Sequence, residues 1–189
     1  MGMIEQLVER VRKFGTVLNK LPEVRYAGDP ILRQVAEEVS LKEGIRIGKR
    51  LGEVLISYRK EVGYGRGFAA PQIGENKAVF VTFVDDKLQI FINPKITDKS
   101  AEKNFYREVC LSSGIMAVDV ERPEWIVLEW TDEKGERHKE KFDGFLARLY
   151  QHEEAHLRGK LNLDEVVEGG IEFALFDPLK EQLRKSRSI

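Results

Sequence analysis

The chain has 189 residues, of which 42% are hydrophobic and 33% are charged, and its formal net charge is −1. This length fits one globular domain with a sizeable core, and the balance of 31 basic and 32 acidic residues excludes the global basic excess typical of nucleic-acid-binding proteins. No apolar run is long enough to cross a bilayer, and no secretory signal or internal repeat is evident. We therefore expect neither DNA nor a membrane as a partner.

The first third of the sequence predicts two helices. Residues 3–21 place apolar side chains at helical spacing, and we treat residues 1–21 as an extension that precedes a single domain at 22–189. Residues 22–39 predict a short strand, a turn and an irregular segment. A second helix begins after Ser40, which can form a capping box with Glu43, and ends at Gly63.

The remainder predicts mainly strands. Residues 63–74 contain three alternating glycines and two alanines, so a ligand or another backbone can approach this segment closely. Alternating or β-branched apolar residues predict strands at 78–84, 88–92, 104–111, 125–131 and 136–142. A helix follows between Gly144 and Gly159, and Asp177 begins a short last helix. This order of elements predicts an α+β fold.

Two of the three histidines lie four residues apart in the segment 151–159, which reads QHEEAHLRG. On a helix, His152 and His156 share a face and can direct two imidazoles at one metal ion, with Glu153 beside them to accept a proton from water. The alternative is a pair of ordinary surface or core histidines. The histidines continue an apolar stripe of the helix, however, and a buried pair of imidazoles needs partners. The pattern therefore favours a hydrolytic metal site.

A hydrolytic metal centre usually takes three protein ligands and leaves one position open for water. The single cysteine, Cys110, can serve as a thiolate, although an isolated cysteine is more often part of a core. A downstream acidic residue is the alternative, as in metallopeptidases, and the candidates are Glu165, Glu168 and Glu172. Spacing alone does not decide between them. Gln72, in the glycine-rich segment, can bond to backbone or polarise a carbonyl oxygen.

Three stretches together resemble the peptide deformylases. Residues 65–72 read GRGFAAPQ, residues 108–112 read EVCLS, and residues 151–159 read QHEEAHLRG. The family carries, in the same order, a Gly-x-Gly-x-Ala-Ala-Pro-Gln loop, a Glu-Gly-Cys-Leu-Ser strand end and a Gln-His-Glu-x-x-His-Leu helix. The resemblance covers about residues 22–185. It implies antiparallel β-sheets packed around a central metal-binding helix, with additional N-terminal and C-terminal helices.

The resemblance also implies an activity. A member of this family is a metal-dependent hydrolase that removes the N-formyl group from the N-terminal methionine of newly made peptides and releases formate. The resemblance implies one Fe(II) or Zn(II) ion held by Cys110, His152 and His156, with water in the fourth position. Thiolate and imidazole ligands suit both metals.

The remaining roles follow from the same resemblance. Glu153 would act as the base, while the Gln72 amide and the Leu111 N–H would stabilise the developing oxyanion. The residues implied in substrate binding are Arg66, Gly67, Val109 and Phe145. The implied partner is an N-formylated peptide, and the compartment is the cytoplasm, or an organelle if the source is eukaryotic. The basic tail at 180–187 offers a ribosome contact, against the simpler interpretation of a solvated helix, and the oligomeric state stays open.

Four positions depart from the family pattern. Val109 stands where the family has glycine, Arg66 stands where an apolar residue is usual, and residues 113–114 replace an apolar-Pro pair. Ala155 replaces an aspartate whose partner arginine corresponds to Arg122. None of these changes removes a ligand, the base or an oxyanion donor, so we expect them to alter substrate choice or rate. The alternatives are a relative with little activity, a protein that only binds peptide termini, and an HExxH metallopeptidase.

Overall fold

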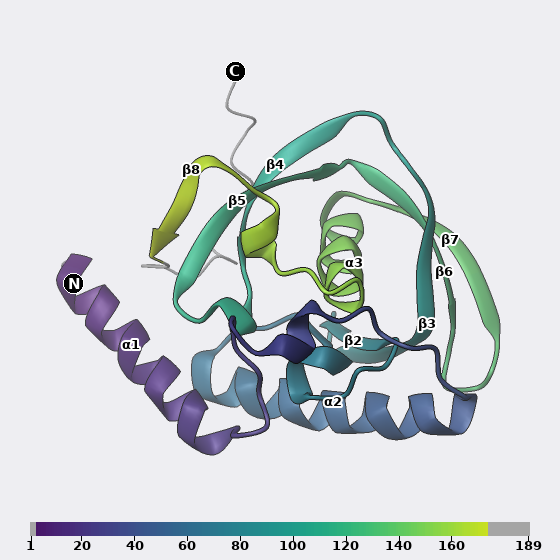
Figure 1. Cartoon of the computed structure of the whole chain (residues 1–189), viewed down its shortest axis with the longest axis horizontal. Coiled ribbons are helices and arrows are strands. Elements are labelled where there is room, and N and C mark those ends of the chain that lie inside the picture. The colour runs from purple at the N-terminus through teal and green to yellow at the C-terminus, as the bar shows by residue number, and fades with distance from the viewer. Residues whose placement is uncertain (1–2, 174–189) are drawn as a thin grey trace.

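The computed structural model describes residues 3–173 (Figure 1). The helices and strands follow one another as α1 (Met3–Lys20), α2 (Leu41–Val62), β1 (Gly67–Ala69), β2 (Val79–Val84), β3 (Lys87–Lys99), β4 (Lys103–Val109), β5 (Met116–Pro123), β6 (Trp125–Thr131), β7 (Arg137–Asp143), α3 (Gly144–Leu157) and β8 (Val166–Phe173). Short 3-10 turns connect several of them. In this range no helix combines the length and the apolar character needed to cross a membrane.

The strands form two antiparallel sheets that curve around α3 (Figure 1). The larger sheet has the order β1-β2-β3-β6-β7, and the smaller has the order β4-β5-β8. Register shifts in β3, between Ile92 and Lys95 and between Ile96 and Asp98, interrupt its pairing with β6. Such irregularities bend a strand, and β3 continues through this bend into β4. The predicted α+β arrangement around a central helix is confirmed.

Helix α3 is fixed against the larger sheet by aromatic packing. Phe80 of β2 and Phe91 of β3 stack with ring centroids 4.5 Å apart, and Tyr150 of α3 lies 5.0 Å from Phe91. Phe80 and Phe91 are at most 1% exposed. Aromatic pairs of this kind bury large apolar areas and prefer defined ring geometries. They therefore set the position of the helix that carries both predicted imidazole ligands.

Helix α2 covers the other face of the same sheet through a row of glycines. A Cβ added at Gly48 would lie 2.4 Å from the side chain of Ile90 in β3. A Cβ at Gly44 or Gly52 would lie 2.7 or 2.5 Å from other β3 side chains. The absence of side chains on this stripe allows the helix to approach the sheet closely. The predicted caps are present at both ends of the helix. The Ser40 side chain accepts from the Glu43 N–H at 3.3 Å, and Gly63 ends the helix with φ 87°.

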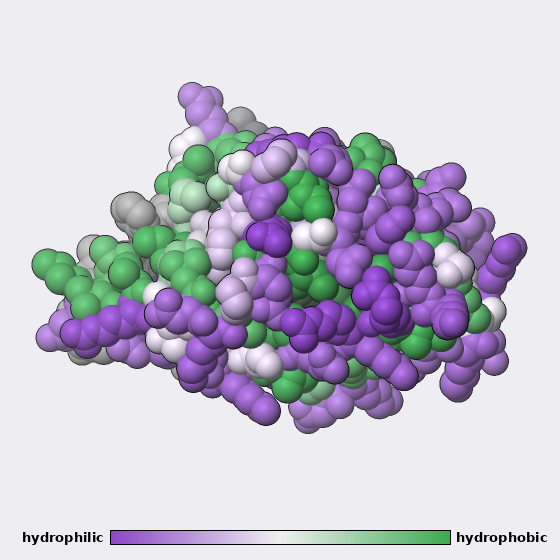
Figure 2. All heavy atoms as spheres, turned by 60° about the horizontal axis from the view of Figure 1, so that its bottom comes forward, coloured by the Kyte–Doolittle hydropathy of each residue, from purple (hydrophilic) through white to green (hydrophobic). Residues whose placement is uncertain are grey.

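Helix α1 packs on α2 and leaves part of its apolar side uncovered. Figure 2 shows apolar atoms gathered at that end of the molecule, where Ile4 is 77% exposed and Val8 and Val11 are about half exposed. The predicted helix at 3–21 is thus present. Its separation from a domain at 22–189 stays a prediction.

The prediction was wrong at five places. Residues 22–39 hold turns and the 3-10 turn Pro30–Arg33 rather than a strand. The strand expected to end near residue 93 runs on to Lys99, and β1, β5 and β8 were not predicted at all. The helix predicted from Asp177 lies outside the described residues.

Candidate metal centre and active site

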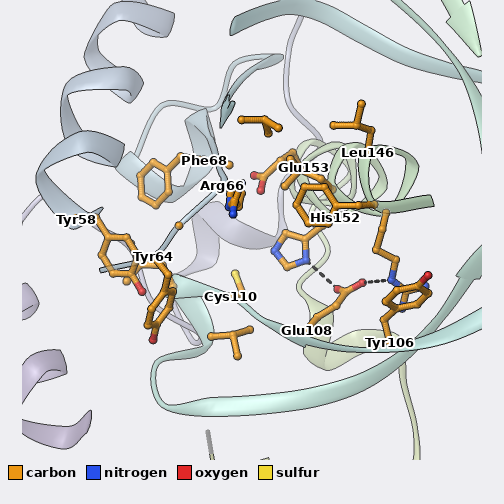
Figure 3. A pocket seen from close by; sticks show the side chains of 18 of the residues that line it. Tyr58, Tyr64, Arg66, Phe68, Tyr106, Glu108, Cys110, Leu146, His152 and Glu153 are labelled. Atoms are coloured by element: carbon orange, nitrogen blue, oxygen red, sulfur yellow. Dashed lines mark hydrogen bonds and ion pairs between the residues drawn. The ribbon is translucent and has the colours of Figure 1, made fainter. Parts of the chain in front are cut away.

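The three residues predicted as metal ligands come together from two distant segments. Cys110 follows the end of β4, while His152 and His156 lie on successive turns of α3. The Cys110 Sγ is 3.3 Å from His156 Nε2, and one ligand atom from each of the three residues lies within 4.8 Å of the others. Cys110 and His156 are at most 2% exposed. Figure 3 shows Cys110 and His152 facing the same space.

This donor set fits a divalent transition metal. Two tetrahedral ligands at about 2.3 Å (sulfur) and 2.0 Å (nitrogen) lie roughly 3.5 Å apart, close to the separation observed between Cys110 and His156. Burial alone would raise the pKa of the Cys110 thiol, but the charge on His156 and hydrogen bonds from both histidines hold that pKa well below its usual value. The residues therefore favour the thiolate that a metal requires.

Glu108 supports His152 from behind. Its carboxylate lies 2.8 Å from His152 Nδ1, so the other ring nitrogen is left for a metal. Arg122 donates to the same carboxylate at 2.7 and 2.9 Å, and Arg148 forms an ion pair with it at 2.8 Å. Burial would raise the pKa of Glu108, but Arg122 and His152 lower it well below its usual value. A carboxylate held in this way fixes the orientation of a ligating imidazole.

Glu165 replaces the carboxylate lost at Ala155. The sequence left Arg122 without its expected aspartate, and it offered Glu165 as an alternative metal ligand. In the structure Glu165 instead accepts from Arg122 Nη1 at 2.7 Å, and Ala155 is 1% exposed. Arg122 is therefore held between Glu108 and Glu165. This compensation was invisible in the sequence, because Glu165 follows Arg122 by 43 residues.

Glu153 lies in a dry position beside the ligands. It is 3% exposed, its Oε2 has no hydrogen-bond partner among the described residues, and burial raises its pKa to about 7 despite the nearby histidines. Its Oε1 lies only 2.2 Å from the position that a Cβ would take at Gly67. The glycine at this position therefore leaves the room that the carboxylate occupies.

Gln72 presents its amide donor to the same centre. Its Oε1 accepts from the Ala69 N–H at 2.9 Å, while its Nε2 donates to Ser112 Oγ at 3.0 Å and lies 3.6 Å from Cys110 Sγ. The predicted bond of this side chain to backbone is therefore present, whereas its role in polarising a carbonyl oxygen stays a prediction. Leu111 begins a 3-10 turn directly after Cys110, and the first N–H of such a turn has no partner within the turn.

A cavity of about 580 Å³ opens in front of these groups. Its wall contains the four residues implied in substrate binding, which are Arg66, Gly67, Val109 and Phe145. It also contains Tyr64, Tyr106 and Arg148, which the sequence analysis did not single out. Arg148 could have been found, because it precedes His152 by four residues and shares its helix face.

A second group of potential ligands lies at the turn between β6 and β7. Asp132, Glu136 and His138 could also reach one ion, but Glu136 is exposed. Asp132 already accepts from the turn N–H groups of Lys134 and Glu136 at 2.9 Å. The turn itself therefore explains why these three side chains lie close together, and no metal ion is needed to explain it.

The fold and the inner site are those expected of a class, namely mononuclear metallohydrolases with one thiolate and two imidazole ligands. Comparison with known proteins identifies the family. The family model described as polypeptide deformylase matches residues 21–170. A peptide deformylase of Pseudothermotoga lettingae is 37% identical over 171 residues, which cover 87% of this chain and 94% of the relative. One from Prochlorococcus marinus strain AS9601 is 43% identical over 146 residues, covering 74% and 71%.

Solved structures agree with this. The peptide deformylase of Thermotoga maritima matches with a TM-score of 0.68 and 34% identity, covering 76% of this chain and 96% of that one. The Synechococcus elongatus enzyme, solved in complex with actinonin, also gives 0.68, with 36% identity and coverage of 76% and 78%. The chain belongs to the polypeptide deformylase family. The predicted family, fold class and enzyme class are confirmed, and the match favours a deformylase over an HExxH metallopeptidase.

Proposed function

We propose that this chain hydrolyses the N-formyl group of formyl-methionyl peptides with one divalent ion, Fe(II) or Zn(II), bound by Cys110, His152 and His156. The observation that carries this proposal is the convergence of the three side chains at the inner end of a cavity in a member of this family. We further propose that the chain acts in the cytoplasm on newly made peptides. The ribosome contact stays a prediction, because the basic tail lies outside the described residues.

A bound divalent ion supplies a Lewis acid that polarises a carbonyl and lowers the pKa of water toward about 7. Glu153 is placed to take the proton from the attacking water and to pass it to the leaving amine. A pKa of about 7 suits both duties at neutral pH, since the group can be either base or acid. Its burial keeps bulk water away from this transfer.

The oxyanion receives hydrogen bonds from two neutral donors. The Gln72 Nε2, oriented by the bond from Ala69 to its Oε1, lies 3.6 Å from Cys110 Sγ, and the Leu111 N–H directly follows Cys110 in the chain. Donors that are fixed before the reaction stabilise the charge that develops in the transition state. Removing one such donor costs about 2.7–4 kcal/mol in comparable sites.

The peptide binds as an added strand between two open edges. β1 is the edge strand of the larger sheet, and β4, which ends at Val109, is the edge strand of the smaller. The Phe83 N–H donates to the Arg66 carbonyl at 2.7 Å, so the next pair, Gly67 with Thr82, falls in the non-hydrogen-bonded position. The N–H and C=O of Gly67 therefore point toward the open edge, where an extended peptide can pair with them.

The test is formate release from formyl-Met-Ala-Ser by the metal-loaded protein, compared with its Glu153→Gln variant. We expect the variant to bind the same amount of metal and to lose about 10²–10⁴-fold in kcat, the usual contribution of a general acid–base group. Free methionine is measured in the same reactions to detect peptidase activity. Equal formate rates in the two proteins, or methionine release without formate, would refute the proposal.

A further inference from the structure

Arg66 is a half-buried cation on the wall of the substrate cavity, and it has no carboxylate partner among residues 3–173. It precedes β1, and its guanidinium lies 5.7 Å from the ring centroid of Phe145 in the first turn of α3. Its Nε is buried without a hydrogen-bond acceptor among the described residues. Within the described range Arg66 forms no ion pair. The ring partly stabilises the cation, but its hydrogen-bonding capacity is not used.

The other arginines of the cavity wall are neutralised. Arg107 pairs with Asp119 at 3.0 Å, and Arg148 pairs with Glu108 at 2.8 Å. The remaining acidic group on the wall outside the catalytic centre is Asp85, in the β2–β3 turn, which is exposed and forms no ion pair with Arg66. Water therefore screens Asp85, and the wall keeps an uncompensated positive charge at Arg66.

This charge lies next to the peptide-binding edge. Arg66 directly precedes Gly67, whose N–H and C=O point toward the open edge of β1. Figure 3 shows the Arg66 side chain in the cavity, on the wall that also carries Tyr64 and Phe68. When a peptide pairs with Gly67, its first side chains, or the C-terminus of a short peptide, therefore lie within reach of the Arg66 guanidinium. An unpaired and partly desolvated guanidinium is a good binding site for a carboxylate, to which it can donate two parallel hydrogen bonds.

We propose that Arg66 selects formylated substrates that carry a carboxylate close to the formylated residue. This inference rests on the proposed function and adds the substrate class. The carboxylate is either an acidic side chain at the position after the formylated residue or the C-terminal group of a short formylated peptide. Both present the same chemistry to the guanidinium, and the experiment separates them.

The test compares three peptides that differ in one charge. Formyl-Met-Gln-Ser-amide is the neutral reference, formyl-Met-Glu-Ser-amide adds a side-chain carboxylate, and formyl-Met-Gln-Ser with a free C-terminus adds the terminal one. We expect the metal-loaded protein to prefer at least one charged peptide by about 10-fold in kcat/KM, the effect of a hydrogen bond to a charged group. The preference should fall as the salt concentration rises.

Variants connect the preference to Arg66. In Arg66→Met we expect the charged and neutral peptides to react within about twofold of each other, and in Arg66→Lys we expect part of the preference to return. Lys49→Met is the matched control, because it also removes one positive charge, from an exposed position of α2 outside the cavity. It should behave like the unaltered protein.

The outcomes separate this inference from the proposed function. Hydrolysis of all three peptides at similar rates would overturn the role of Arg66 and leave the activity standing, as would a charge preference that survives in Arg66→Met. If no peptide is hydrolysed, the proposed function fails. The affinities of the three peptides for the metal-loaded protein, measured by calorimetry, then test the role of Arg66 independently of catalysis. Equal affinities would overturn that role.

Discussion

The inner end of the cavity and its outer wall are built in different ways. At the inner end, Cys110, Glu153 and His156 are at most 3% exposed, and the carboxylate behind His152 is held by two arginines. On the outer wall, Phe145 is 44% exposed and Arg66 has no ion-pair partner among the described residues. The departures at Arg66 and Val109 lie on this wall. The buried departure at Ala155 is compensated by Glu165.

This contrast shows which part of the site can vary. A buried charge or ligand that loses its partner costs several kcal/mol, so a change at the inner end requires a second change that restores the contact. The outer wall is partly solvated, and a new side chain there alters contacts with the substrate at little cost in stability. We expect substitutions at the inner end to abolish metal binding or chemistry, and substitutions on the wall to change substrate preference.

The largest effect is expected from Cys110→Ala. With three protein ligands, loss of the thiolate should weaken metal binding by more than the roughly 10–100-fold that follows loss of a residue behind a ligand. Metal per chain is measured by atomic emission after anaerobic purification, together with formate release. A variant that keeps one metal per chain would remove Cys110 from the metal site and revive the HExxH peptidase hypothesis.

The second prediction concerns the point where wall and inner end meet. In Gly67→Ala the new Cβ would lie 2.2 Å from Glu153 Oε1, so the carboxylate must move. We expect kcat to fall by about 10²-fold or more, as for a displaced general base, while metal content stays the same. The open space at Gly15 makes Gly15→Ala the matched control, since a Cβ there meets nothing within 4 Å. An unchanged kcat in Gly67→Ala would show that Glu153 does not act from this position.

The sequence predicted local contacts well and distant contacts poorly. The exception is the distant contact of Cys110 with the two histidines. Spacing of four residues placed His152 and His156 on one face, but only the resemblance to a family brought Cys110 to them. Glu165 could not be assigned, because its role depends on a contact across 43 residues. Strand β5 was missed for a related reason. It buries Asp119 and Arg122, whose charges are neutralised by partners on other segments, and this breaks the apolar alternation that identifies strands.

The smallest effect on metal binding, and the one that tests the support of the inner end, is expected from Glu108→Gln. The substitution leaves Arg148 and His152 without their carboxylate, so we expect about 10–100-fold weaker metal binding and a loss of about 3–5 kcal/mol in stability at pH 7. Because the pKa of Glu108 is lowered in the folded protein, its contribution to stability is full above its unfolded pKa of about 4.5 and is lost as the pH falls below that value.

Urea unfolding of the metal-free proteins between pH 7 and pH 3 measures this dependence. The difference between the unaltered protein and Glu108→Gln should stay constant down to about pH 5 and then narrow, because the unfolded chain takes up a proton at Glu108 before the folded protein does. Glu165→Gln is the matched control, since its side chain is 22% exposed and Arg122 keeps Glu108, so the loss should be smaller. A difference that does not narrow on acidification would mean that Glu108 stabilises the site by packing, and the inner end would then owe its rigidity to shape rather than to paired charge.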